Sequence, residues 1–104
     1  MNTLQEISEK LLLALYKIHR EEGEILEESI SFDKNEQWEV SGGNQELVDA
    51  LLSLASGSVL DLKNSLKYLN EKDLISFQTQ GYLGGEVEIY NLEVTSNAID
   101  VIEA

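Results

Sequence analysis

The chain has 104 residues, a length that suits one compact domain. It carries 20 acidic and 7 basic residues, a formal net charge of -13, and no cysteine. Disulfides and thiolate chemistry are therefore excluded, and a single histidine excludes any site that needs two imidazoles from one chain. The hydrophobic share of 42% is too high for a disordered acidic tail, so the composition indicates a folded, strongly acidic domain.

The sequence has no pattern typical of a membrane-spanning segment. Its longest uninterrupted apolar stretch, residues 11–16, is far shorter than the roughly 20 residues that span a bilayer. The first residues lack a basic region ahead of an apolar block, so we expect no secretory signal. Together with the lack of cysteine, this predicts a cytoplasmic location.

A first helix is predicted from about Thr3 to Glu22. Thr3 and Glu6 have the spacing of a capping box, and Gly23 suits the C-terminal stop. Between them, apolar side chains recur at three- and four-residue steps along one helix face: Leu4, Ile7, Leu11, Leu15 and Ile18.

An acidic extended or hairpin segment is predicted at about residues 23–43. Two short runs that alternate polar and apolar residues, 29–32 and 37–40, flank a polar stretch that can turn. Between Glu21 and Asp49 there are ten carboxylates and one lysine, Lys34. This charge indicates either a solvated loop or a surface that docks a basic partner or mimics nucleic-acid phosphates.

Two helices in quick succession are predicted next. Asn44 caps the first, which ends at Gly57, and Ser58 caps the second. A break this short between amphipathic helices is typical of a helix-turn-helix arrangement. The positions expected to be buried are Leu47, Leu51, Leu54 and Ala55 in the earlier helix, and Val59, Leu62, Leu66 and Leu69 in the later one.

After Asp73 the apolar period changes to two, which predicts strands over residues 74–80 and 86–92. The glycine-rich residues 81–85 supply a tight reversal between them. Thr95 then caps a short closing helix with an apolar inner face.

The order of these elements, and two local motifs, resemble the winged helix-turn-helix domains of MarR and PadR-like regulators. Residues 62–75 look like a recognition helix that runs into the first wing strand, with Asp73 where a glycine is usual. Residues 92–98 are similar to the leucine-threonine motif that follows the wing, with Ala98 in the place of its glycine. The resemblance covers roughly residues 44–103. It implies a single α+β winged-helix domain over the whole chain: a three-helix core, a C-terminal β-hairpin wing and a closing helix.

The resemblance also implies a DNA-binding transcriptional regulator, whose third helix enters the major groove while the wing touches the flanking backbone. The candidate reading residues are Asn64, Lys67 and Tyr68 on the outward face of that helix and Lys63 at the margin of this face. Asparagine reads adenine, and lysine binds phosphate or guanine. The net charge opposes this function, as does the lack of Lys and Arg after residue 73.

The alternative is an acidic protein–protein interaction module that docks a basic partner or mimics nucleic acid. Its candidate contacts are Trp38 in the acidic segment and Tyr82 and Leu83 at the wing tip. Trp38 either anchors a partner or pins its segment to the core. The two wing-tip residues either form a contact patch or fold back on the domain.

A homodimer is expected from the wide apolar coverage of the first helix, since winged helices often pair through their terminal helices. The candidate interface residues are Leu12, Leu13, Tyr16, Ile99 and Ile102.

We expect no enzyme activity, cofactor or metal site. No pair of carboxylates is placed in an apolar pocket by any pattern in the sequence, and no glycine-rich loop precedes a helix to cradle phosphate. His19, near the acidic end of the first helix, is expected to be a surface residue.

Overall fold

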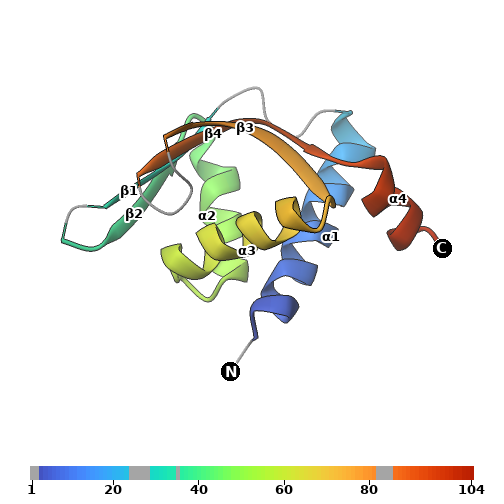
Figure 1. The fold of residues 1–104 in the computed structure, drawn as a ribbon, viewed down its shortest axis with the longest axis horizontal. Coiled ribbons are helices and arrows are strands. Elements are labelled where there is room, and N and C mark those ends of the chain that lie inside the picture. The colour runs from blue at the N-terminus through green and yellow to red at the C-terminus, as the bar shows by residue number, and fades with distance from the viewer. Residues whose placement is uncertain (1–2, 24–28, 35, 82–85) are drawn as a thin grey trace.

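The computed structural model describes residues 3–23, 29–34, 36–81 and 86–104 (Figure 1). In chain order, its elements are α1 (Leu4–Glu22), β1 (Ile30–Lys34), β2 (Trp38–Gly42), α2 (Gln45–Leu54), α3 (Val59–Glu71), β3 (Ile75–Gly81), β4 (Val87–Val94) and α4 (Ser96–Ile102). Over these residues the fold is α+β, with four helices and a four-stranded antiparallel sheet, as the sequence predicts at that level. None of the helices is both long and apolar enough to cross a membrane.

Each helix begins at the cap that the sequence predicts. The side-chain oxygens of Thr3, Asn44, Ser58 and Thr95 each accept a hydrogen bond from the amide three residues later, at 3.2 Å in every case. These bonds satisfy amides that have no partner within the helix. The sequence thus sets the helix starts locally.

The sheet joins two hairpins that the sequence presents separately. Its strand order is β2-β1-β4-β3, and β1 pairs with β4 through residues 30–32. The acidic segment predicted at residues 23–43 forms the β1–β2 hairpin in its described part, while residues 24–28 and 35 lie outside the described residues. The hairpin predicted over residues 74–92 is confirmed as β3 and β4. Strands β1 and β4 are therefore central, and β2 and β3 are the edges.

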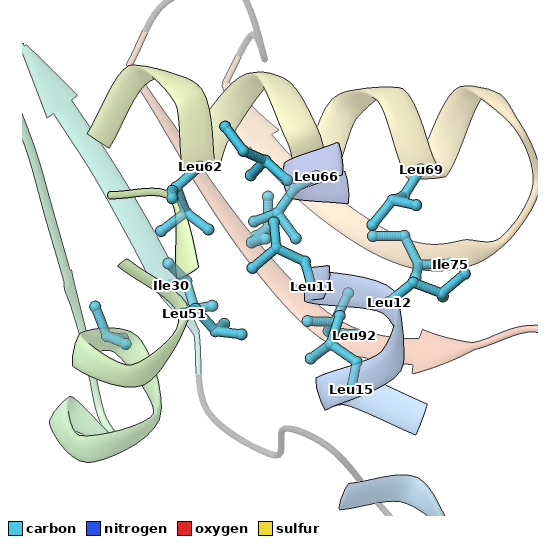
Figure 2. Close-up of a cluster of buried hydrophobic side chains, with 14 of the residues drawn as sticks. Leu11, Leu12, Leu15, Ile30, Leu51, Leu62, Leu66, Leu69, Ile75 and Leu92 are labelled. Atoms are coloured by element: carbon cyan, nitrogen blue, oxygen red, sulfur yellow. The ribbon is translucent and has the colours of Figure 1, made fainter. Parts of the chain in front are cut away.

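The core lies between α1, α2 and α3 and one face of the sheet (Figures 1 and 2). Leu62, Leu66 and Leu69 of α3 are fully buried, as predicted. In α2, the buried residues are Val48, Leu51 and Ala55. The prediction placed Leu47 and Leu54 there, but both are only half-buried. The helix carries apolar residues on more than one face, so periodicity alone does not choose the inward one.

The joint between α3 and β3 contains Asp73, the residue that stands where the resemblance places a glycine. Asp73 has φ +59°, in the left-handed region of backbone conformation. Aspartate is one of the few residues other than glycine that adopt this conformation. The Thr95 hydroxyl donates to the Asp73 carbonyl at 2.6 Å, and the Asn97 amide donates to its carboxylate at 2.7 Å. These two bonds tie the residue that precedes β3 to the start of α4.

Candidate functional site

The outer face of α3 carries three of the four predicted reading residues. Asn64, Lys67 and Tyr68 border a shallow depression of about 250 Å³, together with Glu71 and with Leu4 from α1. Leu4 is 40% exposed, and Leu60, one turn before Asn64, is 43% exposed. The structure therefore brings polar and apolar side chains together on this face.

The fourth predicted reading residue, Lys63, is not on that exposed face. It is 3% exposed, and its ammonium lies 4.7 Å from the centre of the Trp38 ring of β2. A projection of α3 alone places Lys63 at the margin of the outer face. In the structure, the β1–β2 hairpin packs over that margin and covers it. Burial lowers the pKa of Lys63, and the nearby charge of Lys67 lowers it further.

The remaining cations of α3 lie beside other side chains. The Lys67 ammonium lies 3.9 Å from a carboxylate oxygen of Glu71, one turn along the helix. The Lys72 ammonium lies 5.7 Å from the centre of the Tyr68 ring. The outer face of α3 thus has no run of unopposed positive charge.

Trp38 is half-buried and packs against the core. A second ammonium, that of Lys34, lies 5.9 Å from the centre of its ring. Of the two roles considered for Trp38, pinning its segment to the core fits this placement. The other candidate contacts, Tyr82 and Leu83, lie outside the described residues.

The face of the sheet that points away from the helices is acidic. Ile30 and Phe32 of β1 and Val87 and Ile89 of β4 are buried, so the residues that alternate with them face outward. The outward carboxylates on the four strands are Asp33, Glu39, Glu88 and Glu93. The only Lys or Arg on these strands is Lys34, which lies beside Trp38. We call this surface the acidic sheet face.

Two details place the carboxylates of the acidic sheet face close together. Asp33 lies directly opposite Glu39 in the β1–β2 register, an arrangement that disfavours the strand pair through like-charge repulsion. Near this end of the sheet, Asp33, Glu86 and Glu88 line a shallow depression of about 210 Å³ with Ser31 and Gln80. The sequence signal for this surface is the set of polar residues that alternate with apolar ones in residues 29–33 and 86–88. The signal predicts one shared surface only if β1 and β4 are known to be neighbours in the sheet.

The predicted dimer residues do not share one exposed surface. Leu12 is 7% exposed and belongs to the core, because the apolar face of α1 packs against both α3 and β4. Leu13 is 47% exposed, whereas Ile99 and Ile102 of α4 are partly buried against the core of the same chain. Leu12 is therefore corrected from an interface candidate to a core residue.

Tyr16, the fifth predicted dimer residue, joins α1 to the end of α4 within one chain. Its hydroxyl donates to the Glu103 carboxylate and accepts from Arg20 at 3.2 Å. The hydrogen bond to Tyr16, followed by the charge of Glu103, raises the pKa of Arg20. The only arginine is thus engaged with the C-terminal residues and not with α3.

Within the described ranges, no group of three or more His, Cys, Asp or Glu side chains is placed to hold a metal ion. His19 lies in the last turn of α1. Comparison of the chain with known families, curated proteins and solved structures found no match. The geometry and charge of two surfaces, the outer face of α3 and the acidic sheet face, therefore carry the functional inference.

Proposed function

We propose that the protein is a non-enzymatic winged-helix module that binds a basic protein surface through its acidic sheet face. The winged-helix part of the proposal is supported by the order of elements, by the short break between α2 and α3, and by the β3–β4 hairpin that follows α3. The left-handed backbone at Asp73, where such domains usually have a glycine, adds local support.

The observation that carries the binding proposal is the distribution of charge over the sheet. Asp33, Glu39 and Glu88 lie on the sheet face that no described helix covers. The only lysine on the four strands, Lys34, lies beside the Trp38 ring. Keeping two carboxylates directly opposed costs stability in the free protein. A basic partner relieves that repulsion, so the same carboxylates favour binding.

Duplex DNA is the weaker candidate because few cations are available to it. A typical binder neutralises about six to ten phosphates. Here Lys63 is buried and Lys67 is paired with Glu71, while the wing strands carry no Lys or Arg. The net charge of -13 also slows the approach of a polyanion.

One observation keeps DNA binding as a second candidate. Asn64, Lys67 and Tyr68 line one depression on the outer face of the helix that enters the major groove in winged-helix domains. If this second candidate holds, Lys67→Glu abolishes retention of duplex DNA at low salt.

The leading proposal is tested with two triple variants of equal charge. Asp33→Asn/Glu39→Gln/Glu88→Gln neutralises the acidic sheet face, and the matched control, Glu9→Gln/Glu22→Gln/Asp100→Asn, neutralises three exposed acids on α1 and α4. Binding of a Lys/Arg-rich peptide is measured by calorimetry at low ionic strength. The sheet-face variant is expected to lose about tenfold in affinity, equivalent to roughly 0.5 kcal/mol for each rim charge.

The control variant is expected to lose much less. Equal losses in the two triple variants would show that the peptide responds only to net charge, and the proposed face would then be wrong. The loss in the sheet-face variant should also shrink as salt is added, because exposed charges are screened.

A further inference from the structure

The β1–β2 hairpin is fixed firmly at its base. A side chain at Gly42 would place its Cβ 2.9 Å from the Ser29 carbonyl oxygen and 2.9 Å from Val48 Cγ2. The close approach of the hairpin base to α2 therefore requires glycine, and any larger residue would push the two apart.

Toward its tip the hairpin has fewer attachments. Strand β1 pairs with β4 through residues 30–32, so from Asp33 onward its only partner among the described residues is β2, which is itself an edge strand. Figure 1 shows this end of the hairpin extending past the rest of the sheet. The hairpin is thus closely packed against α2 at its base, and it lacks the pairing with β4 in the part that lies near α3.

The contact that holds this end to α3 is between Trp38 and Lys63. The Lys63 ammonium lies 4.7 Å from the centre of the indole ring, the residue as a whole is 3% exposed, and no described carboxylate forms an ion pair with it. Among the described residues, an aromatic ring and no carboxylate faces this lysine. A cation–π contact of this kind is weak enough to exchange for a phosphate contact.

Covering Lys63 also separates two cations that the helix places together. Lys63 and Lys67 are one turn apart on α3, with Asn64 between them in sequence. Lys67 is exposed, whereas Lys63 lies under the hairpin. Lifting Trp38 would return Lys63 to the surface beside Lys67.

We propose that the β1–β2 hairpin is a strap that withholds Lys63 from the outer face of α3, and that lifting Trp38 opens a phosphate-binding pair formed by Lys63 and Lys67. The ligand class of the open form is the phosphodiester backbone of duplex DNA, with Asn64 adjacent to the base edges. The closed form leaves α3 unsuited to DNA. This inference does not depend on the basic partner of the acidic sheet face.

The test compares Trp38→Leu with the wild-type protein in binding a labelled 30-base-pair duplex, followed by fluorescence anisotropy over a salt series. Leucine keeps apolar packing and removes the ring that holds the ammonium. The variant is expected to bind about fivefold more tightly at low salt, the effect of one additional ion contact in water. Its plot of log K against log salt should be steeper by about 0.9, the contribution of one phosphate.

Two further variants make this result specific. Trp38→Phe retains an aromatic face and should bind like the wild-type protein, while Trp38→Leu/Lys63→Gln should lose the whole gain. A gain that survives in the double variant, or no gain in Trp38→Leu, overturns the proposal.

The rate of acylation of each lysine amine, measured by mass spectrometry, reports whether the β1–β2 hairpin covers Lys63. In the wild-type protein, Lys63 should react more slowly than Lys10, which is exposed on α1. In Trp38→Leu, the rate at Lys63 should rise while that at Lys10 stays constant. Equal rates at the two lysines in the wild-type protein, or a rise at all lysines in the variant, contradict a strap that acts on Lys63.

Discussion

The strands of the β3–β4 hairpin are longer than those of the β1–β2 hairpin, and the two hairpins are held in different ways. In the β3–β4 hairpin, β4 is central, and it contributes four buried side chains, Val87, Ile89, Leu92 and Val94. In the β1–β2 hairpin, β1 buries Ile30 and Phe32, while β2 is an edge strand with no fully buried residue. Both hairpins thus pair one core strand with one edge strand, but the edge strand β3 buries Ile75 fully, whereas the edge strand β2 buries no residue fully.

This difference places binding potential on the second hairpin. A strand that contributes little to the core can carry charges at little cost to folding, and β1–β2 carries Asp33 opposite Glu39 and the Trp38–Lys63 contact. Stability is rarely uniform over a domain, and surfaces that bind or move come from its less stable parts. The following predictions test this contrast, from the largest expected effect to the smallest.

The two strands of the β1–β2 hairpin should respond very differently to truncation. Phe32→Ala on β1 is expected to lower the free energy of unfolding by about 3–5 kcal/mol, because Phe32 is fully buried. Val40→Ala on β2 should lower it by about 1 kcal/mol, since this residue is half-buried. Urea unfolding measures both, and equal losses would contradict the contrast between core strand and edge strand.

The base of the β3–β4 hairpin has a polar joint that can be removed separately. Thr95→Ala deletes both the cap of α4 and the hydrogen bond to the Asp73 carbonyl, so a loss of about 2 kcal/mol is expected. Ser58→Ala removes only a cap, that of α3, and should cost about 1 kcal/mol. A Thr95→Ala loss no larger than that of Ser58→Ala, in thermal unfolding, would show that the joint adds nothing.

The Trp38–Lys63 contact predicts a dependence of stability on pH. Burial, and then Lys67, lower the pKa of Lys63 below the ordinary value of 10.5. The unfolded chain therefore binds more protons at this site than the folded protein, so the contribution of Lys63 to stability rises with pH in the window that ends at about 10.5. Besides Lys67 on its own helix, Lys34 lies on the hairpin beside the same ring.

Urea unfolding of the wild-type protein and of Lys63→Met, at a series of pH values from neutral upward, isolates this effect. The free energy of unfolding of the wild-type protein should rise relative to that of the variant as the window is approached. A constant difference, or a relative fall, would contradict burial of a charged Lys63.

The smallest effect concerns the opposed carboxylates. Asp33→Asn should raise the free energy of unfolding by a few tenths of a kcal/mol at low salt, about the size of one like-charge pair across strands. The control is Glu93→Gln, since Glu93 lies opposite Ser76 and has no such repulsion to relieve. The gain should vanish at high salt; a gain of the same size in both variants would place its origin elsewhere.

The sequence predicts the helices of this protein well because their signals are local. Caps three residues from the amides they bond, and leucines at helical spacing in α3, need no knowledge of the rest of the chain. The resemblance to winged helices drew attention to Asp73, whose left-handed backbone fits the place of a glycine.

The features that escaped prediction depend on contacts between distant segments. Pairing of β1 with β4 joins residues far apart in sequence, and without it the acidic sheet face does not exist. Lys63 belongs to the margin of α3 in projection, but in the structure it is 3% exposed and its ammonium lies 4.7 Å from the centre of the Trp38 ring. Leu12 was expected at a dimer interface, but α1 meets enough of α3 and β4 to bury it within one chain.

The most direct test of the account is the binding of the wild-type protein to duplex DNA at low salt, followed by fluorescence anisotropy. We expect only weak binding with a shallow salt slope, because Lys63 is covered, Lys67 is paired with Glu71, and the net charge is -13. Saturable binding with a salt slope near -6, the mark of about six or seven phosphate contacts, would contradict it.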